Sequence, residues 1–204
     1  STSDEMKLLK NKGKYITVEV TPQHLTLFSP DCYNKLNSLA QMNPPIRSIK
    51  HQLGLWKGIK NGTVDVIGSD HAPHTLEEKK NQWPNSPSGM PGVQTTLSIM
   101  LNHVNNKKLS LPKLVELLSE NPCKIYNIKN KGFIKKNYDA DITVIDLNKE
   151  IVIKNKDIVS KSGWTPYNDM KLKGMPIATI VNGEVKMLYG KTLDRPNGKA
   201  IDFN

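Results

Sequence analysis

The sequence feature that most constrains the fold is a short apolar run at residues 64–69 that leads directly into a polar segment, residues 70–74, with the sequence DHAPH. A short run of this kind, bounded by turn formers, predicts a strand. Turn-forming residues follow at 83–92, and helical periodicity follows at 93–104 and 111–118. This alternation of strand, loop and helix predicts an α/β architecture built on a parallel sheet.

The first sixty residues give further local signals. Thr2 and Glu5 form a potential capping box, which predicts a helix that ends near Gly13. Residues 15–20 are rich in β-branched side chains and predict a strand, whereas residues 53–59 have helical spacing. Between them, a double proline within residues 41–48 excludes a helix interior and predicts an extended, rigid loop.

The pattern changes near residue 127. Residues 141–146 alternate between polar and apolar side chains, and two apolar runs at 177–181 and 184–188 flank an Asn-Gly pair. Asn-Gly between two such runs is a strong signal for a β-hairpin. We therefore expect an α/β domain over residues 1–127 and a small β domain over residues 128–204.

The composition restricts the classes of function. A net charge of +10 suggests nucleic-acid binding, but Arg47 and Arg195 are the only arginines and the lysines are scattered, so we do not expect a nucleic-acid partner. No apolar run approaches the roughly 18 residues of a membrane span, and the first residues lack the features of a signal peptide. Cys32 and Cys123 are far apart, which predicts buried thiols in a reducing compartment, the cytoplasm.

The densest candidate for chemistry is the DHAPH segment. In an α/β barrel, polar residues at the C-terminal end of a strand are typical of catalytic positions. Asp70 is placed to contact a metal or to act as a general base, and His74 to bind substrate or transfer a proton. The alternative is a hydrogen-bonded turn without function, and we favour the functional interpretation because His74 follows so closely after an apolar strand.

Two other loops are weaker candidates. In residues 42–47, MNPPIR, the prolines present the Asn43 amide, which can both donate and accept hydrogen bonds to an amide or imide. In residues 87–92, PSGMPG, the glycines allow the backbone to approach a ligand closely. For each loop taken alone, an ordinary surface loop is the favoured alternative.

Taken together in order, these segments resemble the dihydroorotases of the amidohydrolase superfamily. Residues 132–134 and 139–146 also resemble that superfamily's small C-terminal β domain, although Asn137 stands where the family usually has glycine. Asparagine tolerates a left-handed backbone, so the departure is mild. The matching segments are VEVTPQHL at 18–25, NPPIR at 43–47, DHAPH at 70–74 and PSGMPGVQ at 87–94.

The resemblance implies the C-terminal part of a (β/α)₈ metal-dependent hydrolase barrel followed by a small β-sandwich-type domain. It implies reversible hydrolysis of dihydroorotate to N-carbamoyl-aspartate in pyrimidine biosynthesis. Asp70 would contact the metal and act as general acid and base, Asn43 and His74 would bind the pyrimidine ring, and the backbone at Ser88 and Gly89 would complete the pocket. The alternatives are another cyclic amidase, of the hydantoinase or allantoinase type, and a non-catalytic scaffolding subunit.

The resemblance also implies one or two zinc ions, and most of their ligands are expected outside this chain. The family's H-x-H pair is missing, and Ser1-Thr2 resembles the end of an H-x-S-T motif whose histidine is a ligand. His24 is expected to serve packing, and Arg47 a structural role. A complete barrel takes roughly 250 residues, so we expect the N-terminal half of the enzyme as a partner, in a homo-oligomer.

Overall fold

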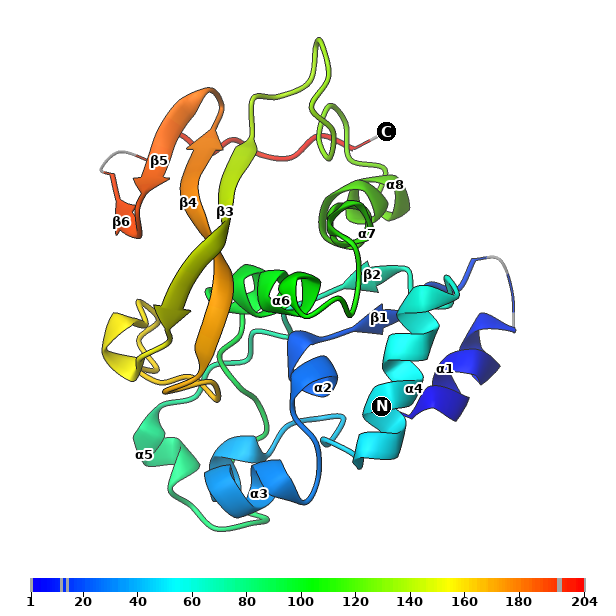
Figure 1. Ribbon diagram of the computed structural model, residues 1–204, viewed down its shortest axis with the longest axis vertical. Coiled ribbons are helices and arrows are strands. Elements are labelled where there is room, and N and C mark those ends of the chain that lie inside the picture. The colour runs from blue at the N-terminus through cyan, green and yellow to red at the C-terminus, as the bar shows by residue number, and fades with distance from the viewer. Residues whose placement is uncertain (1, 12, 14, 194–195, 204) are drawn as a thin grey trace. The chain divides into compact units, whose positions relative to one another are not determined.

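The computed structural model describes residues 2–11, 13, 15–193 and 196–203, and the chain forms two compact units (Figure 1). Unit 1 comprises Ser1–Ile99 and Val152–Lys171, and unit 2 comprises Met100–Ile151 and Leu172–Asn204. The expected boundary between residues 127 and 128 falls inside unit 2, where helices that follow residue 100 share a unit with the later strands. The division into domains at that boundary stays a prediction.

Unit 1 contains a parallel pair of strands, as predicted. Strand β1 (Glu19–Val20) pairs with β2 (Val66–Ile67), with Glu19 opposite Val66. Both are shorter than the predicted strands at 15–20 and 64–69. Helix α2 (Pro22–Thr26) follows β1 at once, because the Thr21 side chain caps it and a proline occupies its first turn.

The predicted capping box is confirmed in helix α1 (Ser3–Lys10), where Thr2 and Glu5 cap each other's backbone amides. Helix α4 (Ile49–Lys60) contains the predicted helix at 53–59 and begins earlier. The two helices lie side by side (Figure 1). Glycine in α4 permits their close approach, since a Cβ atom on Gly58 would lie 2.4 Å from Cε of Met6.

A hydrophobic cluster in unit 1 lies where the double-proline loop and the loop around Met90 meet. The buried side chains of Cys32, Ala40, Met42, Ile46, Met90 and Trp164 form one hydrophobic cluster. Trp164 belongs to the segment that returns to unit 1 late in the chain. The cluster includes residues of α3 (Asp31–Leu36) and of the 3₁₀ helix η1 (Asn37–Ala40). Unit 1 also contains α5 (Leu76–Lys79) and η3 (Asn155–Asp157).

Helix α6 (Thr96–Asn105) confirms the helix predicted at 93–104 and runs from the end of unit 1 into unit 2. A continuous helical stretch then covers and extends the prediction at 111–118. It consists of α7 (Leu111–Val115), the π-helical η2 (Glu116–Glu120) and α8 (Asn121–Ile125).

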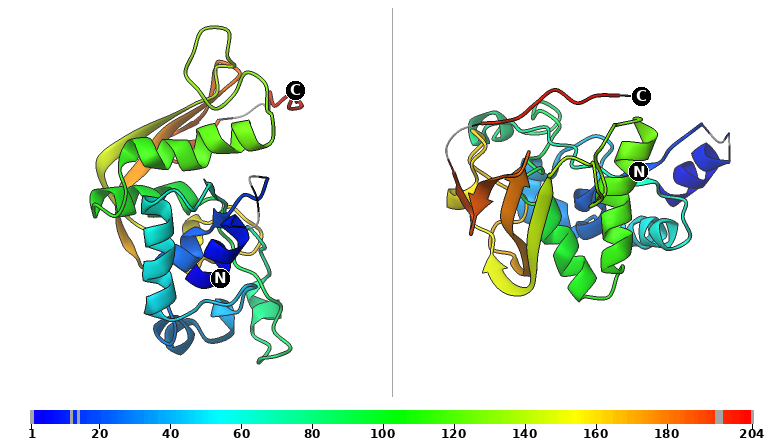
Figure 2. Two further views of the ribbon diagram at one scale, coloured as in Figure 1. Left: turned by 90° about the vertical axis from the view of Figure 1, so that its right-hand side faces the viewer. Right: turned by 90° about the horizontal axis from the view of Figure 1, so that it is seen from above.

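The sheet of unit 2 has the order β3-β4-β5-β6 (Figure 2). Its strands are β3 (Ile142–Val152), β4 (Lys171–Val181), β5 (Glu184–Leu188) and β6 (Lys191–Thr192). The predicted hairpin is confirmed: Val181 pairs with Glu184, and Asn182 and Gly183 both have positive φ, at 50° and 81°. The described strands of unit 2 form one sheet, so the second layer of a sandwich stays a prediction.

Within the described ranges, no helix is both long and apolar enough to cross a membrane.

Candidate active site

The site in unit 1 is a cavity of about 500 Å³ at the ends of the two parallel strands. Its polar lining comes from β1 and the residues beside it, from the segment after β2, from the double-proline loop and from the start of the chain: Thr2, Glu5, Thr17, Glu19, Thr21, His24, Asn43 and Asp70. Helix α1 supplies apolar residues to the same wall, among them Met6 and Leu9. Two of the residues predicted from the sequence, Asn43 and Asp70, therefore line one cavity.

Asp70 follows β2 closely and is held in a left-handed backbone conformation, with φ of 43°. Its neighbours fix this conformation. His71 forms a parallel bridge with Met90, the Ala72 amide donates to the Met90 carbonyl at 3.1 Å, and His71 Nδ1 accepts from the Gly92 amide at 3.0 Å. Such strain, about 1–3 kcal/mol for a non-glycine residue, persists only where the surroundings impose it, and it is concentrated at functional sites. Asp70 itself is exposed.

Glu19 is a second carboxylate at the cavity, and the sequence interpretation missed it. Its side chain lies over Gly68, where a Cβ atom would be 2.3 Å from the Glu19 Cδ. Burial raises the pKa of Glu19, and the negative charge of Asp70 raises it further. A signal was present in the sequence, since Glu19 is an acidic residue inside a β-branched run. Glu5 also lines the cavity, and carboxylates around one cavity favour bound protons or cations over anions.

His24 is buried, and both nitrogens of its ring are engaged. Nδ1 lies 2.8 Å from the Thr21 hydroxyl, and Nε2 lies 2.9 Å from the Pro44 carbonyl, which can only accept. Burial lowers the pKa of His24, which favours the neutral ring. The histidine therefore ties α2 to the loop that carries Asn43 and has no nitrogen left for a metal.

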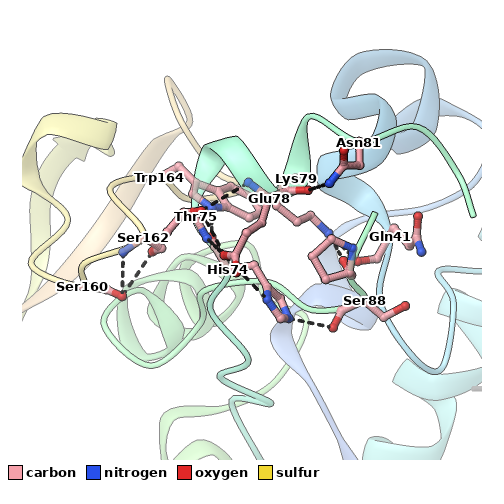
Figure 3. Close-up of polar contacts among 11 residues, drawn as sticks. Gln41, His74, Thr75, Glu78, Lys79, Asn81, Ser88, Ser160, Ser162 and Trp164 are labelled. Carbon is pink, nitrogen blue, oxygen red and sulfur yellow. Dashed lines mark hydrogen bonds and ion pairs between the residues drawn. The ribbon is translucent and has the colours of Figure 1, made fainter. Parts of the chain in front are cut away.

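The other predicted residues form a second cluster (Figure 3). His74 Nε2 donates to the Ser88 carbonyl at 3.3 Å, and Nδ1 lies 4.0 Å from a carboxylate oxygen of Glu78. Gly89, at φ of 145°, faces the same ring, because a Cβ atom there would lie 3.2 Å from His74 Cδ2. His74, Ser88 and Gly89 are therefore brought together, and their role in binding substrate stays a prediction.

A backbone hydrogen bond connects the loop that carries Asn43 to the second cluster. The Gly89 amide donates to the Gln41 carbonyl at 3.0 Å, two positions before Asn43. Trp164 Nε1 donates to the His74 carbonyl at 2.7 Å and fixes the segment from the other side. No local sequence signal indicated this role of Trp164, because it lies 90 positions from its partner.

The donors at the cavity do not by themselves form a metal centre. Among the described residues, no three His, Cys, Asp or Glu side chains are grouped so that they could hold an ion. Asp70 and Glu19 offer carboxylates there, whereas the His24 ring is engaged elsewhere. A catalytic zinc typically keeps three protein ligands, so this part of the chain supplies at most a fraction of such a site.

Comparison with known proteins defines the class. The model of the amidohydrolase family matches residues 3–186, and the chain belongs to this family of α/β metal-dependent hydrolases. Over 202 residues it is 41% identical to a dihydroorotase from Pyrococcus furiosus, a match that covers 98% of this chain and 47% of the relative. A dihydroorotase from Staphylococcus aureus is 39% identical over 190 residues, which cover 91% of this chain and 44% of the relative. The chain spans about half the length of these relatives.

Solved structures agree with this fold. An L-hydantoinase (dihydropyrimidinase) from Arthrobacter aurescens superimposes with a TM-score of 0.90 at 30% identity, covering 95% of this chain and 45% of that one. A dihydropyrimidinase from Brevibacillus agri gives a TM-score of 0.85 at 24% identity, covering 94% and 43%, and shows the fold alone.

Proposed function

We propose that this chain is the C-terminal half of a dihydroorotase, which hydrolyses dihydroorotate reversibly to N-carbamoyl-aspartate in pyrimidine biosynthesis. Its barrel part would span residues 1–127 and its small β domain residues 128–204. The observation that carries the proposal is Asp70, exposed at the end of a parallel strand in an imposed left-handed conformation, with Asn43 lining the same cavity. The identity of about 40% to dihydroorotases across the chain supports it.

In this proposal each residue has a defined part. Water adds to the ring carbonyl carbon, the C–N bond breaks, and Asp70 carries the proton from the attacking water to the departing ring nitrogen. The Asn43 amide, which both donates and accepts, matches the imide edge of the pyrimidine. His74 and the backbone at Ser88 and Gly89 bind the rest of the ring. Their mutual contacts hold them ready for substrate.

We also propose that one or two zinc ions bind here, with Asp70 as one ligand and the remaining ligands on the N-terminal half of the enzyme. The metal would supply Lewis-acid polarisation of the scissile carbonyl. Helix α1 borders the cavity with exposed apolar side chains, Leu8 at 58% and Leu9 at 46% exposure. Such side chains are suited to be covered by the missing half. Association into a homo-oligomer is a further expectation.

The test is a dihydroorotate ring-opening assay on the material as isolated, with any co-purifying chain retained and zinc supplied. Asp70→Asn should lose at least about a hundredfold in turnover, the usual contribution of a general acid–base group, with an unchanged free energy of unfolding. Asp4→Asn, at an exposed position on α1, is the matched control and should keep normal turnover. Near-normal turnover in Asp70→Asn would remove Asp70 from the mechanism.

A second candidate function is hydrolysis of another cyclic amide, favoured by the 0.90 TM-score to an L-hydantoinase. A panel of dihydroorotate, hydantoin, dihydropyrimidine and allantoin substrates separates the two. Turnover confined to hydantoins or dihydropyrimidines would replace the dihydroorotase proposal. Absence of turnover on all of them, with the complementary half and zinc present, would indicate a scaffolding subunit.

A further inference from the structure

Lys79 is a fully buried lysine whose position the proposed mechanism does not use. It ends helix α5 with 0% of its surface exposed, and its Nζ donates to the Gln41 carbonyl at 2.9 Å and to the Pro87 carbonyl at 2.8 Å (Figure 3). Lysine is almost never fully buried unless it is paired. Within the described part of the chain, the ion pairs of unit 1 do not include Lys79, so carbonyl dipoles alone compensate its charge.

The two carbonyls belong to the two loops that carry proposed substrate-binding groups. Gln41 is two positions before Asn43, and Pro87 directly precedes Ser88. The same loops are joined by the Gly89 amide, which donates to the Gln41 carbonyl, and by the Gln41 side chain, which donates to the Ser86 carbonyl at 2.6 Å. The ammonium group therefore lies at the point where both loops meet.

The third element at this point is helix α5, which starts shortly after His74. Its Thr75 cap and the bond from the Ser38 hydroxyl to the Lys79 carbonyl fix the helix against η1. One side chain thus connects the segments that carry Asn43, His74 and Ser88. The withdrawal of this side chain from water lowers the pKa of Lys79 to about 8.

Burying the charged ammonium group of Lys79 costs free energy, so a compensating benefit is expected from the two hydrogen bonds that it donates to the loops. Hydrogen bonds from an ammonium are shorter and stronger than those from a neutral donor, and the three N–H groups can serve two carbonyls at once. Two such bonds fix the orientation of two peptide planes, and with them the direction of the groups that follow at Asn43 and Ser88. Pre-organisation of this kind improves binding because less freedom is lost when the ligand arrives.

We propose that Lys79 is a positioning residue for the substrate pocket, whose buried ammonium holds the Asn43 loop and the Ser88–Gly89 loop in a fixed relation. The inference rests on the proposed function for the identity of the substrate. The coupling of the two loops is a property of this chain alone and can be measured separately.

The test compares Lys79→Met, which keeps the length of the stem but removes the ammonium, with Lys80→Met, which removes an exposed ammonium one position later. Two quantities are measured on the chain together with its complementary half: amide hydrogen exchange at Gly89, and kcat and KM for dihydroorotate. Lys79→Met loses one hydrogen bond to each of the two loops, so Gly89 exchange and KM should each rise at least about tenfold. The value of kcat should change less than about threefold, and Lys80→Met should match the wild type.

Each outcome decides the proposal. Gly89 exchange and KM equal in the two variants would overturn it, as would an equal loss in kcat and kcat/KM. Lys79→Gln retains a shorter neutral donor and should fall between Lys79→Met and the wild type. If both replacements at position 79 unfold unit 1, Lys79 is a determinant of stability and not a positioning residue. A wild-type preparation without dihydroorotate turnover would refute the proposed function, while Gly89 exchange would still decide the coupling of the loops.

Discussion

Replacing Gly89 with alanine tests whether the second cluster is packed as tightly as the structure shows. The backbone at Gly89 has φ of 145°, and a Cβ atom would lie 2.4 Å from the Ala72 carbonyl oxygen and 2.8 Å from the Ala72 Cβ. The backbone strain costs about 1–3 kcal/mol, and displacing Ala72 adds about 1–3 kcal/mol. The free energy of unfolding of unit 1 should therefore fall by about 2–6 kcal/mol.

Gly163→Ala separates the two contributions. Gly163 also has a positive φ, 67°, but among the described residues no atom beyond its chain neighbours lies within 4 Å of its Cβ position. This variant should lose only the cost of a left-handed alanine, about 1–2 kcal/mol. The difference between the two variants reports chiefly the contacts of the new methyl group with Ala72 and with the His74 ring.

The assay is urea unfolding followed by tryptophan fluorescence, with stability taken from the midpoint and the slope. All three tryptophans, Trp56, Trp83 and Trp164, belong to unit 1, so the signal reports that unit. Because the new methyl group would also lie 3.2 Å from the His74 ring, KM for dihydroorotate should rise in the active assembly. A loss of stability in Gly89→Ala no larger than in Gly163→Ala would refute the reasoning.

Three further predictions concern single contacts. Trp164→Phe leaves the partly buried His74 carbonyl without its 2.7 Å donor and should lower the unfolding free energy by about 1–2 kcal/mol in the same assay. Trp83→Phe, at an exposed residue, should change it little. Asn105→Leu removes the hydrogen bonds that the side-chain amide donates to the Leu147 and Lys173 carbonyls, and it should destabilise unit 2 by about 2–3 kcal/mol. Amide hydrogen exchange in β3 and β4 measures this loss. Unchanged exchange rates would contradict the prediction. Burial lowers the pKa of His103 to about 4, so the unfolded state binds more protons than the folded state between pH 6.5 and 4. The free energy of unfolding of unit 2 should therefore fall as the pH decreases through that window. His103→Gln should flatten this dependence.

The sequence was most informative where structure depends on residues a few positions apart. The capping box of Thr2 and Glu5 and the hairpin at Asn182 and Gly183 are decided within three or four positions, and both are found as predicted. The parallel pairing of β1 and β2 also followed from the alternation of strand and helix. The strands are only two residues long, however, because pairing partners and not β propensity set their ends.

The sequence by itself indicated the family and which loops carry Asn43, Asp70, His74, Ser88 and Gly89, because those motifs are written in consecutive residues. Only the tertiary structure decided how the loops meet. The Lys79 ammonium reaches a carbonyl 38 positions away, and Trp164 reaches one 90 positions away. These partners lie too far along the chain for a local sequence pattern to mark either role. Burial and backbone carbonyls, which no local pattern records, determine what these two side chains do.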